Sequence, residues 1–203
     1  ILASEGHDEQ PFDAGTLAEI LARPAEPPAR VEGLIGWEAS TLLVAQRKVG
    51  KTTMVLNLAR CLVSGEAFLG AHGVRGLAPG SRVGFLNFEV SGAQLARWAR
   101  DAGVSVDRLY LVNLRGRRNP LAHPGDRQRL AEVLRAQRVE SLIVDPFGRA
   151  YSGASQNDAG EVYGWLVQLD QFTRSEVGAR DLVLTTHAGW DGERSRGSSA
   201  LED

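Results

Sequence analysis

Four apolar runs of strand length recur along the chain, and their spacing limits the possible fold more than any other feature. They are STLLVA (40–45), RVGFLNFE (82–89), SLIVDPF (141–147) and DLVLTTH (181–187), with a weaker run, RLYLVNL (108–114), between the second and the third. Segments with helical patterns separate these runs. Continuous apolar strands that alternate with helices are typical of a parallel sheet covered on both faces. We therefore predict an α/β fold with a mostly parallel sheet and helices on both faces.

Length and composition narrow the class of protein. The 203 residues are 43% hydrophobic and 24% charged, and no apolar run approaches the length of a membrane span, so we expect a soluble chain without a membrane partner. The formal net charge of −2 argues against a globally basic nucleic-acid binder but leaves a local basic patch open. A single cysteine, Cys61, cannot form an internal disulfide, and no signal peptide is recognisable. We therefore predict a cytoplasmic location.

The first 32 residues differ in character from the rest. A short amphipathic helix is expected from about residue 14 to residue 22, and three prolines between residues 24 and 28 then exclude regular structure. The predicted organisation is a leader over residues 1–32 and one core domain over residues 33–203. Because the chain begins with Ile1 and stops after RGSSALED, we expect a fragment that is truncated at its C-terminus.

The segment AQRKVGKTT (45–53) connects the first apolar run to an apolar-periodic helix that ends at Gly65. This order of strand, loop and helix is the context in which a G-x-x-x-x-G-K-[ST] phosphate loop is credible, although Ala45 replaces its first glycine. The methyl group is tolerable if Ala45 keeps a negative φ. Backbone amides at a helix start can bind phosphate, the lysine can reach the β and γ phosphates, and the following hydroxyl can hold Mg²⁺. The predicted nucleotide-binding residues are Ala45, Lys48, Val49, Gly50, Lys51, Thr52 and Thr53.

Two acidic residues follow apolar runs and are candidates for catalysis. Asp145 follows the run SLIV, and a carboxylate there is costly to bury unless it faces a ligand, so we predict that it holds Mg²⁺ together with Thr52. The alternative is an aspartate that caps a turn before Pro146. Glu89 ends the run after the phosphate loop, so it can face the γ phosphate.

Together these segments resemble the RecA-like P-loop ATPases, and more narrowly the hexameric RepA-type helicases and related AAA family ATPases of plasmids, phages and actinobacteria. The matching segments are AQRKVGKTT, FLNFEVSGAQLARWARDAG, LIVDPFGRAY and LTTHAGWDGERSRGSSALED. The resemblance implies a RecA-like P-loop fold from about Gly33 onward, with ATP and Mg²⁺ as cofactors and a homo-oligomer, a hexamer in the full-length protein. It also implies that Glu89 orients the attacking water and that Lys51 and Asp145 complete the catalytic set.

The resemblance extends to residues beyond the phosphate loop. It implies that His187 senses the γ phosphate, although an ordinary surface histidine is the alternative. It also places Arg149, Arg194 and Arg196 in loops that touch nucleic acid, where Tyr151 or Trp190 could stack on bases; ordinary flexible loops are equally compatible with these segments. The basic run LRGRRNP (114–120) is either a solvated face or a contact to a neighbouring subunit.

The predicted function is an ATP-binding and ATP-hydrolysing motor core of a DNA-handling protein of the replication or helicase type, with single-stranded DNA as partner. The alternative is a nucleotide-stabilised adaptor or scaffold with little turnover. Two other classes of P-loop protein are less consistent with the sequence. In a small-molecule kinase Glu89 would have no obvious role, and a partitioning-type ATPase would have a lysine in place of Gln46. In the resembling proteins an arginine finger follows the RGSSAL segment, so we expect slow hydrolysis by this chain alone.

Overall fold

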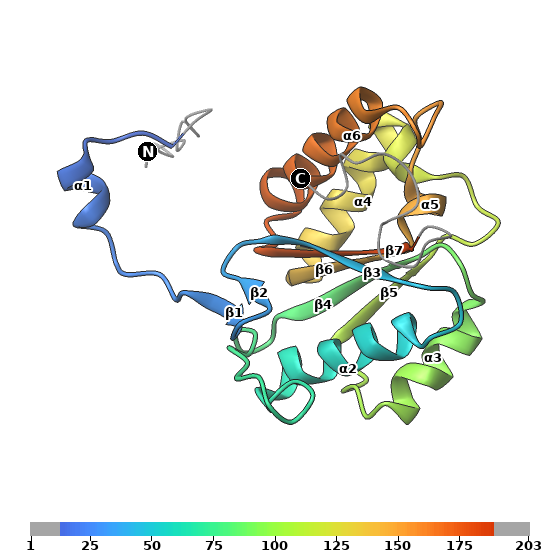
Figure 1. The fold of residues 1–203 in the computed structure, drawn as a ribbon, viewed down its shortest axis with the longest axis horizontal. Coiled ribbons are helices and arrows are strands. Elements are labelled where there is room, and N and C mark those ends of the chain that lie inside the picture. The colour runs from blue at the N-terminus through green and yellow to red at the C-terminus, as the bar shows by residue number, and fades with distance from the viewer. Residues whose placement is uncertain (1–12, 189–203) are drawn as a thin grey trace, which may run out of the picture.

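The computed structural model describes residues 13–188 and shows a five-stranded sheet, whose strands are all parallel (Figure 1). The strand order is β3-β7-β6-β4-β5. The strands are β3 (Ser40–Ala45), β4 (Arg82–Asn87), β5 (Leu109–Asn113), β6 (Val139–Asp145) and β7 (Asp181–His187). All five apolar runs therefore form strands, and the predicted parallel sheet is confirmed.

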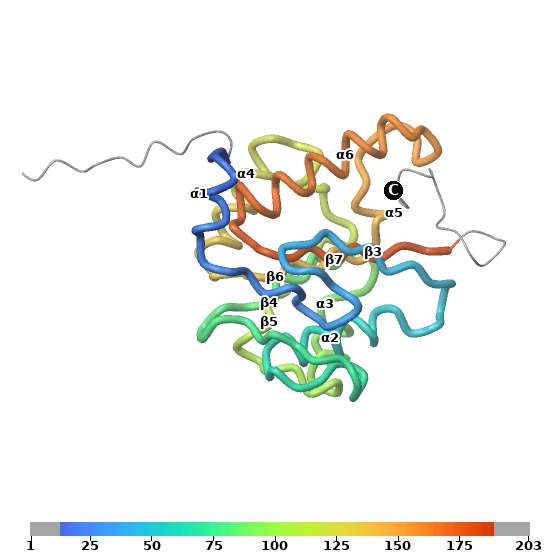
Figure 2. Tube along the Cα trace, turned by 60° about the vertical axis from the view of Figure 1, so that its left-hand side comes forward, coloured from blue at the N-terminus to red at the C-terminus, as the bar shows by residue number. Residues whose placement is uncertain are grey.

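Helices cover both faces of the sheet, as predicted. Helices α2 (Lys51–Ser64) and α3 (Gly92–Asp101) lie on one face, and α4 (Pro124–Ala136) and α6 (Ala159–Gln171) lie on the other (Figure 1). The tube view shows the sheet between the same two layers (Figure 2). Successive strand residues pack into different layers because side chains alternate along a strand. In β6, Ile143 joins the core under α2 and α3, whereas Leu142 and Val144 join the core under α4 and α6.

Two of the strands end earlier than their apolar runs. Strand β4 ends at Asn87, so Glu89 lies in the connection to α3 and not at the last position of the strand. Strand β6 ends at Asp145, and the next residues enter the short helix α5 (Phe147–Ala150). After α6 the chain continues as the π-helix η2 (Phe172–Val177), and the 3-10 helix η1 (Pro120–Ala122) precedes α4. None of the described helices is long and apolar enough to cross a lipid bilayer.

The N-terminal segment contains three short elements. Helix α1 (Leu17–Leu21) is shorter than predicted; Thr16 and Glu19 form a capping box at its start, and it buries no residue. Strand β1 (Ala29–Val31) pairs antiparallel with β2 (Ile35–Gly36). Arg30 and Val31 are buried, so this end of the predicted connector packs against the core. The division of the chain at residue 33 itself stays a prediction.

Candidate nucleotide-binding site

A cavity of about 590 Å³ lies at the carboxyl ends of the parallel strands. In parallel α/β sheets, ligands bind at this edge. Eight of the residues that the sequence singled out line the cavity: Lys48, Gly50, Lys51, Thr52, Thr53, Glu89, Arg149 and His187. The predicted phosphate loop and the candidate catalytic residues thus meet at one place, although their chemical roles remain predictions.

The loop between β3 and α2 has the geometry of an anion site. Lys48 and Gly50 have φ of 63° and 95°, in the left-handed region, and this reverses the chain direction between strand and helix. Ala45 is the last residue of β3 and pairs with His187 on β7, and its φ is not positive, so its methyl group causes no strain. No side chain caps the start of α2, which leaves its first amides to face the cavity.

The Lys51 side chain lies along this loop. It is only 8% exposed, and its Nζ donates to the carbonyl oxygens of Ala45 at 2.9 Å and Gln46 at 2.7 Å. Burial lowers the pKa of Lys51, and the nearby carboxylates of Asp145 and Glu89 oppose this shift. The ammonium group therefore lies beside the α2 amides and is held by two carbonyl oxygens. A bound phosphate would compete with these carbonyls for its hydrogen bonds.

Asp145 joins the phosphate loop to the sheet. One carboxylate oxygen accepts a hydrogen bond from the Thr52 hydroxyl at 3.0 Å, and the other accepts from the Thr185 hydroxyl on β7. Burial raises the pKa of Asp145, although the two hydroxyls oppose this shift. Among the described residues the carboxylate makes no hydrogen bond to the turn before Pro146, which argues against the turn-capping alternative. Mg²⁺ prefers one or two protein oxygens plus phosphate oxygens and water, and Thr52 and Asp145 fit that pattern.

A buried amide that the sequence analysis did not single out fixes the loop that carries Glu89. Asn87 is fully buried, and its Oδ1 accepts from the backbone N–H groups of Glu89 at 3.2 Å and Val90 at 3.1 Å. Its Nδ2 donates to the Val90 carbonyl at 2.8 Å and to Asn113 Oδ1 at 3.0 Å. The sequence signal for this role is a polar residue within an apolar strand. Burial of an amide is costly unless it is hydrogen-bonded, so such a residue is expected to bond neighbouring backbone groups.

His187 lies at the end of β7 with its ring half-buried at the cavity. Burial, with a smaller contribution from Lys51, lowers the pKa of His187, so the neutral ring is the form present at pH 7. Within the described part of the chain, its buried Nδ1 has no hydrogen-bond partner. These features differ from those of an ordinary exposed histidine and suit a group that responds to a ligand.

Comparison with known families gives the site a context. The sequence profile of a family described as an AAA domain matches residues 7–193, which is most of the chain. The chain belongs to this family of P-loop ATPases. The RecA-like P-loop fold of this AAA domain agrees with the resemblance drawn from its sequence. No curated protein matches the chain closely enough to count as a relative.

The structure describes only some of the residues predicted to touch nucleic acid, and their contact with nucleic acid stays a prediction. Arg149, on α5, is exposed and lines the same cavity of the AAA domain as the phosphate loop. Tyr151 cannot stack on bases as predicted, because its ring packs against Phe147 and Trp165 with centroids 5.3 and 5.6 Å apart. Arg194, Arg196 and Trp190 lie outside the described residues.

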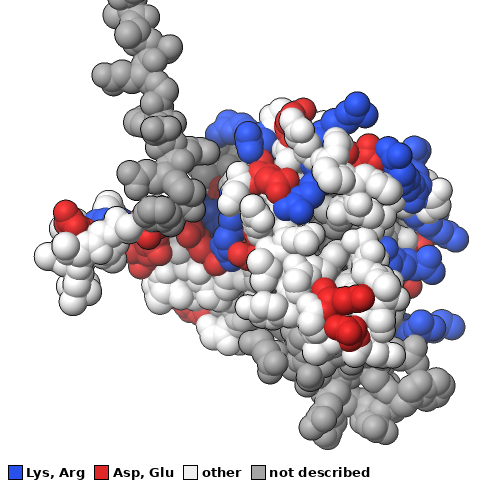
Figure 3. Space-filling model, turned by 90° about the horizontal axis from the view of Figure 1, so that it is seen from above, with Lys and Arg blue, Asp and Glu red and all other residues white. Residues whose placement is uncertain are grey.

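Two further features concern the surroundings of the cavity. Trp98, on α3, lines it and is 40% exposed; the sequence analysis missed this residue, although it lies on the helix that follows Glu89. In the basic run 114–120, Arg118 pairs with Asp126 on α4, so part of the run is neutralised within the chain. Basic side chains also gather along one edge of the molecule when it is seen from above (Figure 3). A local basic surface therefore exists despite the net negative charge.

Proposed function

We propose that this AAA domain binds Mg-ATP in the cavity at the carboxyl edge of the sheet and hydrolyses it. The observation that carries the proposal is the hydrogen bond between Thr52 and Asp145, which joins the start of α2 to the end of β6 beside Lys51. That bond brings a hydroxyl, a carboxylate and an ammonium group together at a helix N-terminus. Each of these groups has a recognised task in phosphoryl transfer.

The residues divide these tasks by their positions. The α2 amides and Lys51 would bind the β and γ phosphates, with Lys51 leaving its two loop carbonyls to do so. Thr52 and Asp145 would hold Mg²⁺, which when bound neutralises phosphate charge. Glu89 would orient a water molecule and accept its proton, and Asn87 keeps the loop of Glu89 in place. The neutral His187 ring would form a hydrogen bond that depends on the γ phosphate.

We further propose that the chain is the motor core of a cytoplasmic DNA-handling protein that works as a homo-oligomer, a hexamer by resemblance. Arg149 and the exposed residues Arg47 and Lys48 surround the mouth of the cavity with positive charge, which supports a site that a neighbouring subunit or single-stranded DNA approaches. The resemblance to RepA-type helicases supports the same assignment.

An ATPase assay titrated with single-stranded DNA tests this proposal. We expect turnover of Mg-ATP that is slow without DNA, rises on addition of a single-stranded oligonucleotide and does not rise with the same mass of a neutral polymer. Tight binding of Mg-ATP with no turnover under either condition would instead support the nucleotide-stabilised adaptor. Turnover that is unchanged by DNA would support ATP hydrolysis and contradict the proposed motor role on DNA.

A further inference from the structure

A second cavity, of about 670 Å³, lies at the opposite edge of the sheet from the nucleotide site. Its lining includes Val139 and Glu140, which begin β6, and Arg180, which precedes β7. The same two strands end at Asp145 and His187 in the nucleotide site. Seven strand residues span about 20 Å, so the two cavities are separate sites. We call the second cavity the basic hollow.

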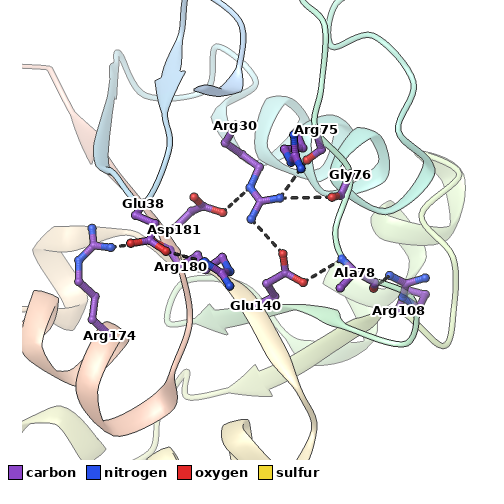
Figure 4. Close-up of polar contacts among 10 residues, drawn as sticks. All are labelled: Arg30, Glu38, Arg75, Gly76, Ala78, Arg108, Glu140, Arg174, Arg180 and Asp181. Carbon is purple, nitrogen blue, oxygen red and sulfur yellow. Dashed lines mark hydrogen bonds and ion pairs between the residues drawn. The ribbon is translucent and has the colours of Figure 1, made fainter. Parts of the chain in front are cut away.

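A buried ion network centred on Arg30 lies beside the basic hollow and reaches its lining through Glu140 (Figure 4). Arg30 is 1% exposed and donates to Asp181 at 2.7 Å and to Glu140 at 3.0 Å. It also donates to the carbonyls of Arg75 at 3.0 Å and Gly76 at 3.3 Å. Both carboxylates are thus paired with a buried arginine, so they do little to neutralise other cations at the surface.

Positive charge exceeds negative charge on the rim. The arginines that line the hollow are Arg75, Arg135, Arg138 and Arg180, and Glu140 is the only acidic residue among the lining residues. Arg180 pairs with Glu38 at 2.6 Å. The other three form no ion pair with any described residue: Arg138 donates to the carbonyl of Pro79 at 3.2 Å, and Arg135 donates to the carbonyl of Glu176. Like charges that line one hollow without carboxylate partners favour a bound anion.

The surroundings of Trp37 indicate how a ligand can be bound in the hollow. Guanidinium carbons lie 4.4 Å from its ring centroid for Arg30 and 5.4 Å for both Arg75 and Arg180. Cations therefore surround the indole ring, which leaves it poorly placed to stack on a nucleobase. A ligand in the hollow would be held through its charge and not through a base.

We propose that the basic hollow binds phosphate groups. A phosphate offers several acceptor oxygens and up to two charges, and guanidinium groups bind it through pairs of parallel hydrogen bonds. Several arginines line the hollow, so more than one guanidinium group is available to a phosphate there, whereas a single carboxylate of an acidic peptide carries half the charge. The phosphate can belong to a small free ligand or to a nucleic-acid backbone. This proposal is independent of ATP hydrolysis, because it concerns the other edge of the sheet.

The test compares two pairs of substitutions that remove the same charge. Arg75→Gln with Arg138→Gln changes the hollow, and Arg100→Gln with Arg129→Gln changes exposed arginines on α3 and α4. All proteins also carry Lys51→Ala, which we expect to remove most phosphate binding at the nucleotide site. The probes are inorganic pyrophosphate, followed by calorimetry, and a labelled single-stranded oligonucleotide, followed by fluorescence anisotropy.

We expect the hollow pair to weaken binding of a probe about tenfold or more, and the control pair to change it by less than about twofold. Weaker binding of both probes assigns the hollow to a nucleic-acid backbone. The salt dependence of oligonucleotide binding should then decrease by the amount expected for the loss of about two phosphate contacts. Loss for pyrophosphate alone assigns it to a small phosphate ligand. Arg75→Lys with Arg138→Lys should fall between, since it keeps charge but not the guanidinium geometry.

Three outcomes overturn the proposal. They are equal weakening by the hollow and control pairs, no measurable binding of either probe, and a glutamate oligomer that binds the hollow more tightly than either probe. Thermal unfolding of each variant verifies that it is folded, which we expect because both substituted side chains are exposed. Failure of Lys51→Ala to weaken ATP binding would count against the proposed function and not against the hollow, because every comparison is made in that same background.

Discussion

Lys51 and Asn87 show two different ways in which single residues serve the nucleotide site. Lys51 faces the cavity directly and is held by two loop carbonyls, whereas Asn87 never reaches the cavity and acts through the backbone of Glu89. The sequence motif predicted Lys51 because the phosphate loop has a fixed spacing. It could not predict Asn87, because the partners of a buried amide depend on how the loop after β4 folds back.

Replacement of Lys51 by alanine should abolish most nucleotide affinity without unfolding the protein. We expect Mg-ATP binding to weaken by at least about 100-fold, since the positively charged ammonium group would interact directly with the negatively charged phosphates. Stability should change by no more than about 1 to 2 kcal/mol, because only two hydrogen bonds to carbonyls are lost. Calorimetry and thermal unfolding measure the two effects, with the exposed Arg97→Ala as control. Unchanged affinity would remove the site assignment.

Replacement of Asn87 by alanine should lower turnover far more than nucleotide affinity. The change leaves the amides of Glu89 and Val90 without their acceptor, so the carboxylate loses its fixed position, and we expect turnover to fall about tenfold or more. Unfolding should become easier by about 2 to 3 kcal/mol. Asn113→Ala is the matched control, because it removes the bond between the two asparagines but keeps the loop contacts. Equal effects of both variants on turnover would contradict a positioning role.

At the scale of elements, the sequence was sufficient for the five strands of the sheet and insufficient for the short hairpin that covers its amino edge. The apolar runs are long enough to show a pattern, although they extend two residues beyond the ends of β4 and β6. Strands β1 and β2 have three and two residues, too few for any periodicity. Arg30 holds them to β7 through Asp181, a residue 151 positions away in sequence, and no local pattern can reveal such a pairing.

Glu140 on β6, which accepts a hydrogen bond from Arg30 of this hairpin, gives a pH-dependent prediction. Burial of Glu140 raises its pKa, but hydrogen bonds from the Ala78 amide and from Arg30 outweigh burial and hold the pKa of the carboxyl below its ordinary value. A depressed pKa contributes stability above the unfolded-state pKa, about 4.3, and this stability is lost as the pH falls through the lower folded-state value. Glu140→Gln should therefore destabilise the protein by about 1 to 2 kcal/mol at pH 7.

The difference between Glu140→Gln and the wild type should shrink as the pH falls below about 4, because the wild-type carboxyl then becomes protonated. Denaturant unfolding at several pH values measures this difference. The exposed Glu132→Gln on α4 serves as control and should show little change at any pH. A destabilisation by Glu140→Gln that is independent of pH would show that shape and not charge holds this edge together.

At the scale of the whole molecule, the sheet separates two charged cavities. One lies at the carboxyl ends of the strands and holds the phosphate loop, and the other lies at their amino ends and carries the unpaired arginines. The recognisable sequence motifs all lie at the first cavity. The second is assembled from residues of four separate segments, none of which has a recognisable motif, so only the folded chain brings its residues together.

If a neighbouring subunit completes the nucleotide site, turnover per chain should rise with protein concentration. Charge builds up on the γ phosphate during transfer, and an arginine supplied by a neighbour can accelerate the reaction by roughly 10³ to 10⁵. ATPase assays over a dilution series, with sedimentation in parallel, measure this dependence. Constant turnover per chain while the chains associate would exclude a contribution from the neighbour.

In the proposed function, Glu89 performs hydrolysis at a site whose other residues bind Mg-ATP. The most direct test compares Glu89→Gln with the wild type in calorimetry with Mg-ATP and in steady-state turnover. The amide keeps the shape of the side chain and removes the carboxylate that orients the water molecule and takes its proton. We predict affinity within about twofold of the wild type and turnover lower by about 100-fold or more. Turnover close to that of the wild type would contradict this role of Glu89 and place the catalytic role elsewhere.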